Sequence, residues 1–183
     1  MHIIEIDNYL SKSDCEYLLD FAKNSTAWSD GGDSFWDNRI IHLASIPDNK
    51  VNDIYKKVLR DIQNIIIKEY RVNQIYPDTI QIVKWNMGDS QDPHSDSINI
   101  DGTEHVTPWR NFGSIIYLND DYLGGETFYP NQNLEITPKS GKMVIHPADL
   151  IFIHGVKEIM RGERYTMPSF WTTDEKHKLG VLF

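Results

Sequence analysis

The stretch DPHSDS, residues 92–97, places an imidazole and a carboxylate two residues apart. In an extended segment, residues i and i+2 point to the same side, so His94 and Asp96 can reach one cation together while Ser95 faces away. Two ligands do not make a metal site. A third ligand must therefore come from elsewhere in the chain.

The choice of the third ligand lies between two histidines of the C-terminal half. His146 precedes Pro147, in a strand-to-turn setting that would orient its imidazole poorly. His154 ends the apolar run 150–153 and precedes Gly155, and an apolar strand would hold an imidazole in a partly dry pocket. We therefore choose His154. The other four histidines are predicted to be surface or packing residues: His2, His42, His105 and His177.

Arg164 follows His154 by ten residues, in a run that is otherwise aromatic and apolar. A guanidinium directed inward from a strand is costly without an anionic partner. It could form a salt bridge with a protein carboxylate, or it could bind the carboxylate of a substrate or cosubstrate through its planar fork. Arg161 lies nearby in a predicted turn, where solvent exposure explains it. Arg164 is therefore our candidate for anion binding.

Two histidines and one carboxylate can hold one face of an iron ion and leave three positions open, which is the arrangement of non-haem Fe(II) oxygenases. Zinc is the competing metal for such ligands. A zinc hydrolase, however, gives no reason for a carboxylate-binding arginine ten residues after the last ligand.

Two helices are predicted in the N-terminal part, after a short strand at 3–6. The first helix begins at a capping box formed by Ser13 and Glu16 and ends near residues 24–26. Cys15 lies on its apolar face and is predicted to be a core residue. The second helix begins after Asp48, runs to about Tyr70 and should lie against a sheet. Its apolar stripe contains Val51, Ile54, Tyr55, Val58, Ile62, Ile65 and Ile66.

Between the two helices, residues 28–38 are rich in Gly, Asp and aromatic residues without periodicity, and they indicate a loop before a strand at about 39–43. Trp28, Phe35 and Trp36 in this loop could form a lid over a site or could anchor the loop to the core.

From residue 79 onward the chain consists of short β-branched and aromatic runs broken by Gly, Pro, Asn and Asp. The predicted fold is mainly β with N-terminal helices, a closed sandwich or jelly roll with the helices packed outside. The longest irregular insert, 98–110, should lie at the mouth of any site at His94 and Asp96. The predicted strands are 79–86, 113–118, 126–129, 134–137, 142–146, 150–154 and 163–172.

Composition excludes several classes of protein. The 18 basic and 27 acidic residues give a formal net charge of -9, which disfavours nucleic acid as a substrate. No apolar run is long enough to cross a bilayer. A lone Cys15 and an N-terminus without a secretion signal favour an intracellular, cytoplasmic protein. We expect one domain over 1–183.

Four segments in order resemble the iron(II) and 2-oxoglutarate-dependent dioxygenases, most closely the prolyl 4-hydroxylase-like group. They are QIVKWNMGDSQDPHSD (81–96), IIYLNDDYLGGETFYP (115–130), PKSGKMVIHPADLIFIHGV (138–156) and GERYTMPSFW (162–171). The resemblance implies a double-stranded β-helix core at about 78–173, with a helical layer at about 1–72 packed on the outer face of one sheet.

The resemblance also implies the cofactors and the site. Fe(II) would be held by His94, Asp96 and His154, with 2-oxoglutarate as cosubstrate, O2 as oxidant and ascorbate as a candidate reductant. Arg164 would bind the distal carboxylate of 2-oxoglutarate, and Tyr117 would add its hydroxyl. Trp85 falls where relatives usually carry a tyrosine that contacts the cosubstrate, so it could contact the cosubstrate or form the pocket wall. The paired glycines Gly124-Gly125 are interpreted as serving strand geometry.

The function implied is hydroxylation of an unactivated C-H bond, with a prolyl residue in a peptide or protein as the leading substrate. Hydroxylation of a free amino acid or another small metabolite is the second enzymatic hypothesis. A non-catalytic metal-binding jelly roll is the hypothesis from a different class. Turnover of 2-oxoglutarate to succinate distinguishes the enzymes from the binding module.

Overall fold

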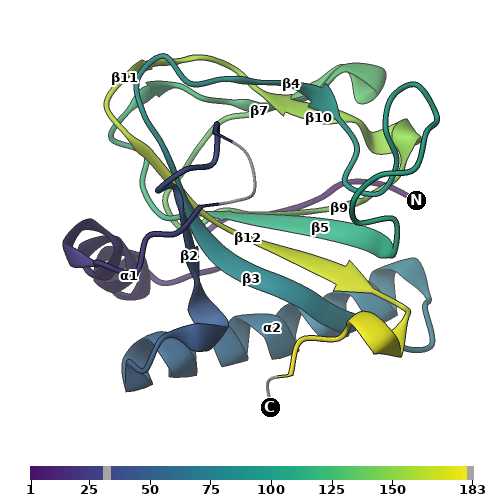
Figure 1. Cartoon of the computed structure of the whole chain (residues 1–183), viewed down its shortest axis with the longest axis horizontal. Coiled ribbons are helices and arrows are strands. Elements are labelled where there is room, and N and C mark those ends of the chain that lie inside the picture. Colours follow the sequence, from purple (N-terminus) through teal and green to yellow (C-terminus); the bar gives the residue numbers. More distant parts are fainter. Residues whose placement is uncertain (31–33, 181–183) are drawn as a thin grey trace.

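Two antiparallel sheets face each other in the computed structural model of this chain, which describes residues 1–30 and 34–180 (Figure 1). In spatial order, the six-stranded sheet consists of β1 (Ile4–Ile6), β9 (Met143–Pro147), β5 (Arg110–Tyr117), β12 (Arg164–Thr172), β3 (Tyr76–Trp85) and β2 (Ile40–His42). The four-stranded sheet consists of β4 (Gln91–His94), β10 (His154–Val156), β7 (Thr127–Tyr129) and β8 (Leu134–Ile136). A separate two-stranded ribbon pairs β6 (Leu123–Gly124) with β11 (Ile159–Arg161), and short 3-10 turns span Leu43–Ser45, Pro130–Gln132, Leu150–Phe152 and Glu175–His177.

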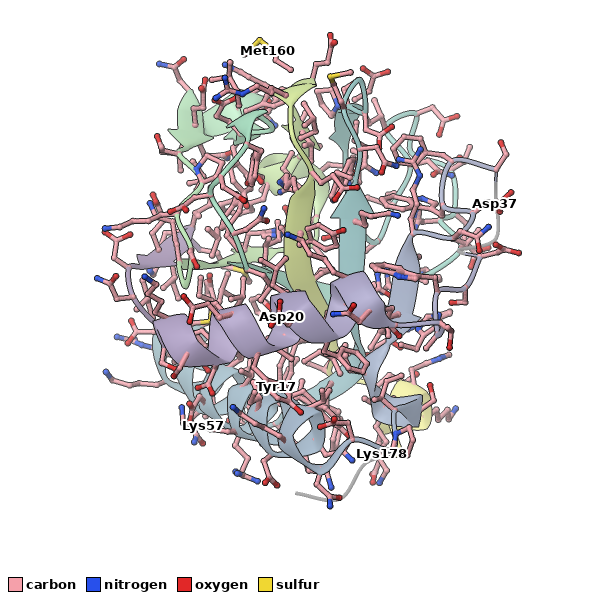
Figure 2. The ribbon with its side chains drawn as sticks, turned by 90° about the vertical axis from the view of Figure 1, so that its left-hand side faces the viewer. Tyr17, Asp20, Asp37, Lys57, Met160 and Lys178 are labelled. Atoms are coloured by element: carbon pink, nitrogen blue, oxygen red, sulfur yellow. The ribbon has the colours of Figure 1, made fainter. Side chains whose placement is uncertain are left out.

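Two helices, α1 (Lys12–Asn24) and α2 (Asn49–Tyr70), lie on the outer face of the larger sheet (Figure 1). The Asp48 side chain caps α2, because its carboxylate accepts a hydrogen bond from the Val51 backbone N–H at 2.9 Å. The Tyr17 hydroxyl of α1 donates to the same carboxylate at 3.0 Å, and Figure 2 shows Tyr17 between the two helices. The Asp48 carboxylate thus caps the N-terminus of α2 and also links α2 to α1 through a hydrogen bond.

The main core lies between these helices and the larger sheet. Alternate residues of β3, such as Ile80 and Ile82, point into this core, whereas Gln81 and Val83 point to the space between the sheets. The observed architecture confirms a double-stranded β-helix with helices packed outside one sheet. Among the described residues, no helix is both long and apolar enough to cross a membrane. One domain over 1–183 stays a prediction.

Two local predictions were wrong. Helix α1 is capped by Ser11 rather than by Ser13, because the Ser11 hydroxyl accepts from the Asp14 backbone N–H at 3.1 Å. The run 150–154 is not a strand, because Asp149 caps a 3-10 turn over Leu150–Phe152 and leaves Ile151 63% exposed. His154 is consequently the first residue of a strand and not the last.

The paired glycines serve backbone geometry, as the sequence predicts. Gly124 and Gly125 have φ angles of 80° and 69°, which favour glycine, and a Cβ on Gly124 would lie 2.1 Å from the Glu158 carbonyl oxygen. The two-stranded β6–β11 ribbon therefore depends on the missing side chain at Gly124.

We expect Gly124→Ala to lower the free energy of unfolding by about 3 kcal/mol or more, since the left-handed backbone alone costs about 1–2 kcal/mol and the clash adds to it. Gly102→Ala is the matched control, because Gly102 has a φ of 83° but open space where its Cβ would lie. Urea unfolding measures both variants. An equal loss of unfolding free energy in Gly124→Ala and Gly102→Ala would contradict the role given to the contact with the Glu158 carbonyl.

Candidate functional site

Strands β4 and β10 bring two histidines together. His94, the last residue of β4, lies directly opposite His154, the first residue of β10, in an antiparallel pair. The centroids of the two rings are 4.6 Å apart. The pairing register between β4 and β10 therefore positions both imidazoles, with a local irregularity just after His154.

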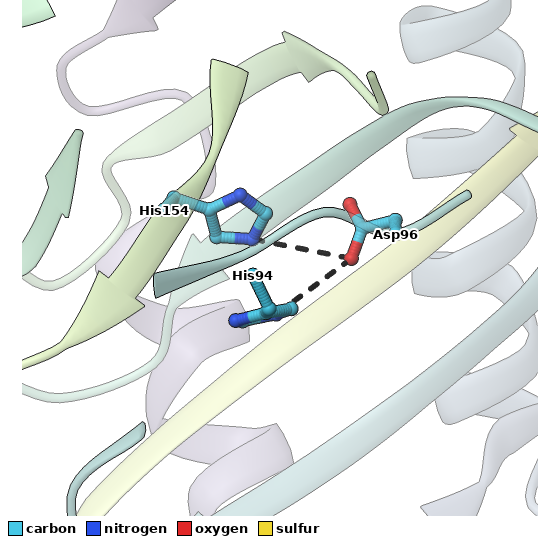
Figure 3. Close-up of side chains that lie close together, drawn as sticks. All are labelled: His94, Asp96 and His154. Atoms are coloured by element: carbon cyan, nitrogen blue, oxygen red, sulfur yellow. Dashed lines mark ion pairs between the residues drawn. The ribbon is translucent and has the colours of Figure 1, made fainter. Parts of the chain in front are cut away.

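Asp96 completes the cluster from the turn after β4. Its Oδ1 lies 3.9 Å from His94 Nε2 and 4.0 Å from His154 Nε2, and Figure 3 shows the three side chains converging. Ser95 is buried, and its hydroxyl donates to the Ala148 carbonyl at 2.6 Å. This anchor holds the backbone of the turn and so helps to fix the direction of Asp96.

The hydrogen bonds of the two histidines suit metal binding. The Nδ1 atom of His94 lies 3.0 Å from the Asp92 carbonyl oxygen, and that of His154 lies 3.2 Å from the Phe152 carbonyl oxygen. Since a carbonyl can only accept, each Nδ1 carries the hydrogen and each Nε2 presents its lone pair to the cluster.

Burial controls the protonation of the cluster. It lowers the pKa of His154 to about 3, with the neighbouring His146 acting in the same direction. Burial alone would raise the pKa of Asp96, but the surrounding imidazoles of His154, His146 and His94 outweigh it and lower that pKa. At neutral pH the cluster therefore offers a neutral His154 imidazole and an ionised Asp96 carboxylate.

These donors fit a divalent iron ion. One ligand atom from each of His94, Asp96 and His154 lies within 4.8 Å of the others, and two imidazole nitrogens with one carboxylate oxygen form the set that suits Fe(II). Asp96 and His154 are only 5% and 6% exposed, so a cation would bind largely away from bulk water. Among the described residues, the free oxygen of Asp96, Oδ2, is buried without a hydrogen-bond partner.

Arg164 lies inside the fold and is 1% exposed. Its Nη2 donates to the Thr127 hydroxyl at 3.1 Å, and its guanidinium lies 5.2 Å from the centroid of the Trp85 ring and 5.3 Å from that of Tyr117. Within residues 1–30 and 34–180, no carboxylate pairs with it, and its Nε has no partner. A buried, unpaired guanidinium is suited to an anionic ligand.

The predicted partners of Arg164 lie beside it. The Tyr117 hydroxyl donates to Thr127 Oγ1 at 2.7 Å, so Tyr117 and Arg164 share the Thr127 hydroxyl. Trp85 is the cross-strand neighbour of Arg164 and lines the cavity, and its buried indole N–H has no partner among the described residues. Contacts of Tyr117 and Trp85 with a cosubstrate stay predictions.

Two residues near Arg164 were missed at the level of sequence. Thr127 bridges Arg164 and Tyr117, and the Tyr122 hydroxyl is buried close to Arg164, without a hydrogen bond of good geometry in the described part of the chain. Burial raises the pKa of Tyr122, so its phenol stays protonated. Both lie in the segment 115–130, where Tyr122 comes two residues before the paired glycines and Thr127 two residues after them, and this position was their signal in the sequence.

The histidine cluster and Arg164 line one cavity of about 540 Å³ between the two sheets. The insert 98–110 contributes His105, Val106 and Thr107 to its lining, in agreement with the predicted position of the insert at the mouth. His42 is exposed, as expected of a surface residue, and His105 is half-buried; both also line this cavity. His146 lines it as well, although it is not one of the three clustered ligands.

Two aromatic residues of the loop 28–38, Trp28 and Trp36, make different contacts. Trp28 packs against the main core, 6.4 Å from Tyr165 between ring centroids, and so anchors the loop. Trp36 lines the cavity and packs edge-on against Trp85 at 5.3 Å. Residues 31–33 lie outside the described part of the chain, so closure of a lid stays a prediction.

Comparison with protein families gives one match over half of the chain. The profile of the 2OG-Fe(II) oxygenase superfamily matches residues 80–172, a range that contains His94, Asp96, His154 and Arg164. Among curated proteins, prolyl 3-hydroxylase 2 of Rattus norvegicus is 29% identical over 75 residues, which cover 38% of this chain and 11% of that protein. Prolyl 3-hydroxylase 1 of Gallus gallus is 30% identical over 74 residues, which cover 38% of this chain and 10% of that protein. The match spans about a tenth of the length of these relatives.

Solved structures of prolyl hydroxylases share the fold. The viral collagen prolyl hydroxylase of Paramecium Bursaria Chlorella virus-1, in complex with 2OG, superposes with a TM-score of 0.74 at 17% identity, covering 96% of this chain and 97% of that chain. A Trichoplax adhaerens prolyl hydroxylase was solved in complex with a peptide fragment of the hypoxia inducible factor oxygen degradation domain. It superposes with a TM-score of 0.75 at 20% identity, covering 98% of this chain and 87% of that chain.

Proposed function

The chain belongs to the 2OG-Fe(II) oxygenase superfamily, and on that premise we propose that it is a 2-oxoglutarate-dependent dioxygenase that hydroxylates a prolyl residue within a peptide or protein. The observation that carries the proposal is the convergence of His94, Asp96, His154 and Arg164 on one cavity. The curated relatives named above are prolyl 3-hydroxylases and the two solved structures are prolyl hydroxylases, one of them solved with a peptide, which supports this substrate class.

Each polar residue of the site has a distinct task in this proposal. His94, Asp96 and His154 would hold Fe(II), and Arg164 would bind the distal carboxylate of 2-oxoglutarate through its planar fork. When bound, Fe(II) and 2-oxoglutarate supply an oxidative decarboxylation that consumes O2, gives succinate and carbon dioxide, and drives hydroxylation of a C-H bond. Thr127 holds the guanidinium in place from the side of β7.

The apolar wall of the cavity protects this chemistry from water. Ile40, Val83, Trp85 and Val156 all line the cavity and are at most 6% exposed. Since water in the site would compete with the substrate for the reacting centre, this wall favours productive turnover.

The outer part of the cavity suits a chain with apolar segments. Pro168 and Phe170 of β12 are half-buried and line the cavity, and Val106 of the insert is 82% exposed beside it. A pyrrolidine ring could pack against such side chains while the rest of a peptide lies across the mouth.

We expect succinate release from purified protein supplied with Fe(II), 2-oxoglutarate, O2 and ascorbate when proline-rich peptides are present. The same assay is run with free proline and with other free amino acids, and mass spectrometry locates the added oxygen on the product. Succinate release with the peptides but not with free amino acids, together with oxygen added to a proline ring, would support the proposal. Release with a free amino acid alone would replace it by the small-metabolite function, and no release with any of them would favour a metal-binding module.

A further inference from the structure

The imidazole of His105 has no task in the functional assignment above. It is half-buried in the insert 98–110, and it lines the same cavity as His94 and Asp96. Among the described residues, its ring makes hydrogen-bond contacts through Nδ1 and none through Nε2. One nitrogen of a ring at the cavity mouth is therefore left for a ligand.

Hydrogen bonds on both sides of His105 hold this part of the insert in place. Before it, Ile98 and Glu104 form an antiparallel bridge, and the Asn99 side-chain amide donates to the Glu104 carbonyl oxygen at 2.9 Å. After it, the Thr107 hydroxyl donates to the Asp96 carbonyl oxygen at 3.0 Å. The histidine is thus presented from a segment that is tied both to itself and to the turn after β4.

The tautomer of His105 follows from its contacts with Thr107. The Thr107 backbone N–H, which can only donate, lies 3.2 Å from Nδ1, and the Thr107 hydroxyl oxygen lies 2.9 Å from the same nitrogen. Nδ1 therefore presents its lone pair, and the hydrogen of the neutral ring lies on Nε2. Because the two nitrogens lie on opposite sides of the ring, His105 offers one hydrogen-bond donor on the side away from Thr107.

A donor at this place suits a prolyl residue within a peptide. Such a residue has no backbone N–H, and the amide carbonyl bonded to its ring nitrogen can only accept. Free proline lacks that carbonyl and carries a charged ammonium group instead. We propose that His105 Nε2 donates to the carbonyl oxygen that precedes the target proline, and so favours peptides over free proline. This inference rests on the proposed function and names a residue that recognises the peptide backbone.

The test compares His105→Asn with His105→Gln. Asparagine keeps an acceptor near the position of Nδ1 but is too short to replace Nε2, whereas the side-chain amide of glutamine can donate from about that position. We expect His105→Asn to raise the KM for a proline-rich peptide by about 3- to 10-fold, the effect of one lost hydrogen bond, and His105→Gln to restore part of it. Succinate release against peptide concentration, with Fe(II), 2-oxoglutarate and O2 supplied, measures the KM.

A modified peptide identifies the group that His105 binds. Replacing the carbonyl oxygen before the proline by sulfur weakens that acceptor, so the thioamide peptide should have a higher KM with the parent. The thioamide should change the KM of His105→Asn much less, because the hydrogen bond is already lost in that variant. Glu104→Gln is the matched control and should respond to both peptides as the parent does, because Glu104 is exposed beside His105 and is not among the residues that line the cavity.

Three results would overturn this inference and leave the proposed function intact. A parent-like KM for the peptide in His105→Asn would show that the imidazole does not bind the substrate. Equal thioamide effects in the parent and in His105→Asn would show that His105 binds another group of the peptide. Weaker Fe(II) binding by His105→Asn without peptide would show that His105 supports Asp96 through Thr107 instead. If the parent forms no succinate with any peptide, the proposed function itself fails, and this inference fails with it.

Discussion

Asp96→Ala is expected to abolish succinate formation and to weaken Fe(II) binding by more than about 100-fold. Loss of a residue that only supports a metal ligand typically costs about 10- to 100-fold in affinity, and here a ligand itself is removed. Asp96 is the only carboxylate in the ligand cluster of the described residues, so two imidazoles would remain to hold the ion. Fe(II) affinity and succinate release are both measured on the purified variant.

Asp92→Ala is the matched control for this experiment. Asp92 also lies two residues from His94, but its side chain is exposed, and only its backbone carbonyl contacts the histidine. The control should therefore bind Fe(II) and form succinate as the parent does. Unchanged turnover in Asp96→Ala, with a parent-like unfolding temperature, would remove the whole site assignment.

The parts of the site that sequence predicted correctly depend on short-range geometry. The two-residue spacing of His94 and Asp96 keeps their side chains close together, although Asp96 lies in the turn after β4 and not in the extended segment that the sequence suggested. The start of α2 at Asp48 is likewise local, because a capping side chain bonds to a backbone N–H three residues later. Such features can be read from neighbouring residues alone.

The missed features depend on pairing between distant strands. Pro147 suggested that His146 is poorly oriented, but its orientation is set by Gly113, a cross-strand neighbour 33 positions earlier that leaves room for the ring. Thr127 gains its role only because β7 and β12 bring its hydroxyl to Arg164. The apolar run 150–153 suggested a strand, yet the side chain of Asp149 stabilises a turn there. His154 lies in the cluster with His94 and Asp96, although not for the reason given by the run, and its role as a ligand stays a prediction.

Arg164→Met is expected to raise the KM for 2-oxoglutarate by about 30-fold to several thousand-fold. Truncating one member of a buried, hydrogen-bonded charge pair costs about 2–5 kcal/mol, and each 1.4 kcal/mol is roughly tenfold in affinity. Fe(II) affinity without 2-oxoglutarate should stay near that of the parent, since Arg164 is not among the clustered ligands. Steady-state kinetics over a range of 2-oxoglutarate concentrations measure the effect. Arg161→Met is the control, because Arg161 is exposed on β11 and should leave the KM unchanged.

Arg164→Met should also show whether Arg164 serves cosubstrate binding or the stability of the fold. In the structure, the guanidinium of Arg164 is buried without a carboxylate partner among the described residues, so it adds little or nothing to the stability of the protein without cosubstrate. Methionine at this position should therefore leave the unfolding temperature of the apoprotein equal or higher, even though the contacts of Arg164 with Thr127, Trp85 and Tyr117 are lost. In the parent, 2-oxoglutarate should raise the unfolding temperature, and in Arg164→Met that rise should disappear. An unstable variant with an unchanged KM would mean that Arg164 serves the fold and does not bind the cosubstrate.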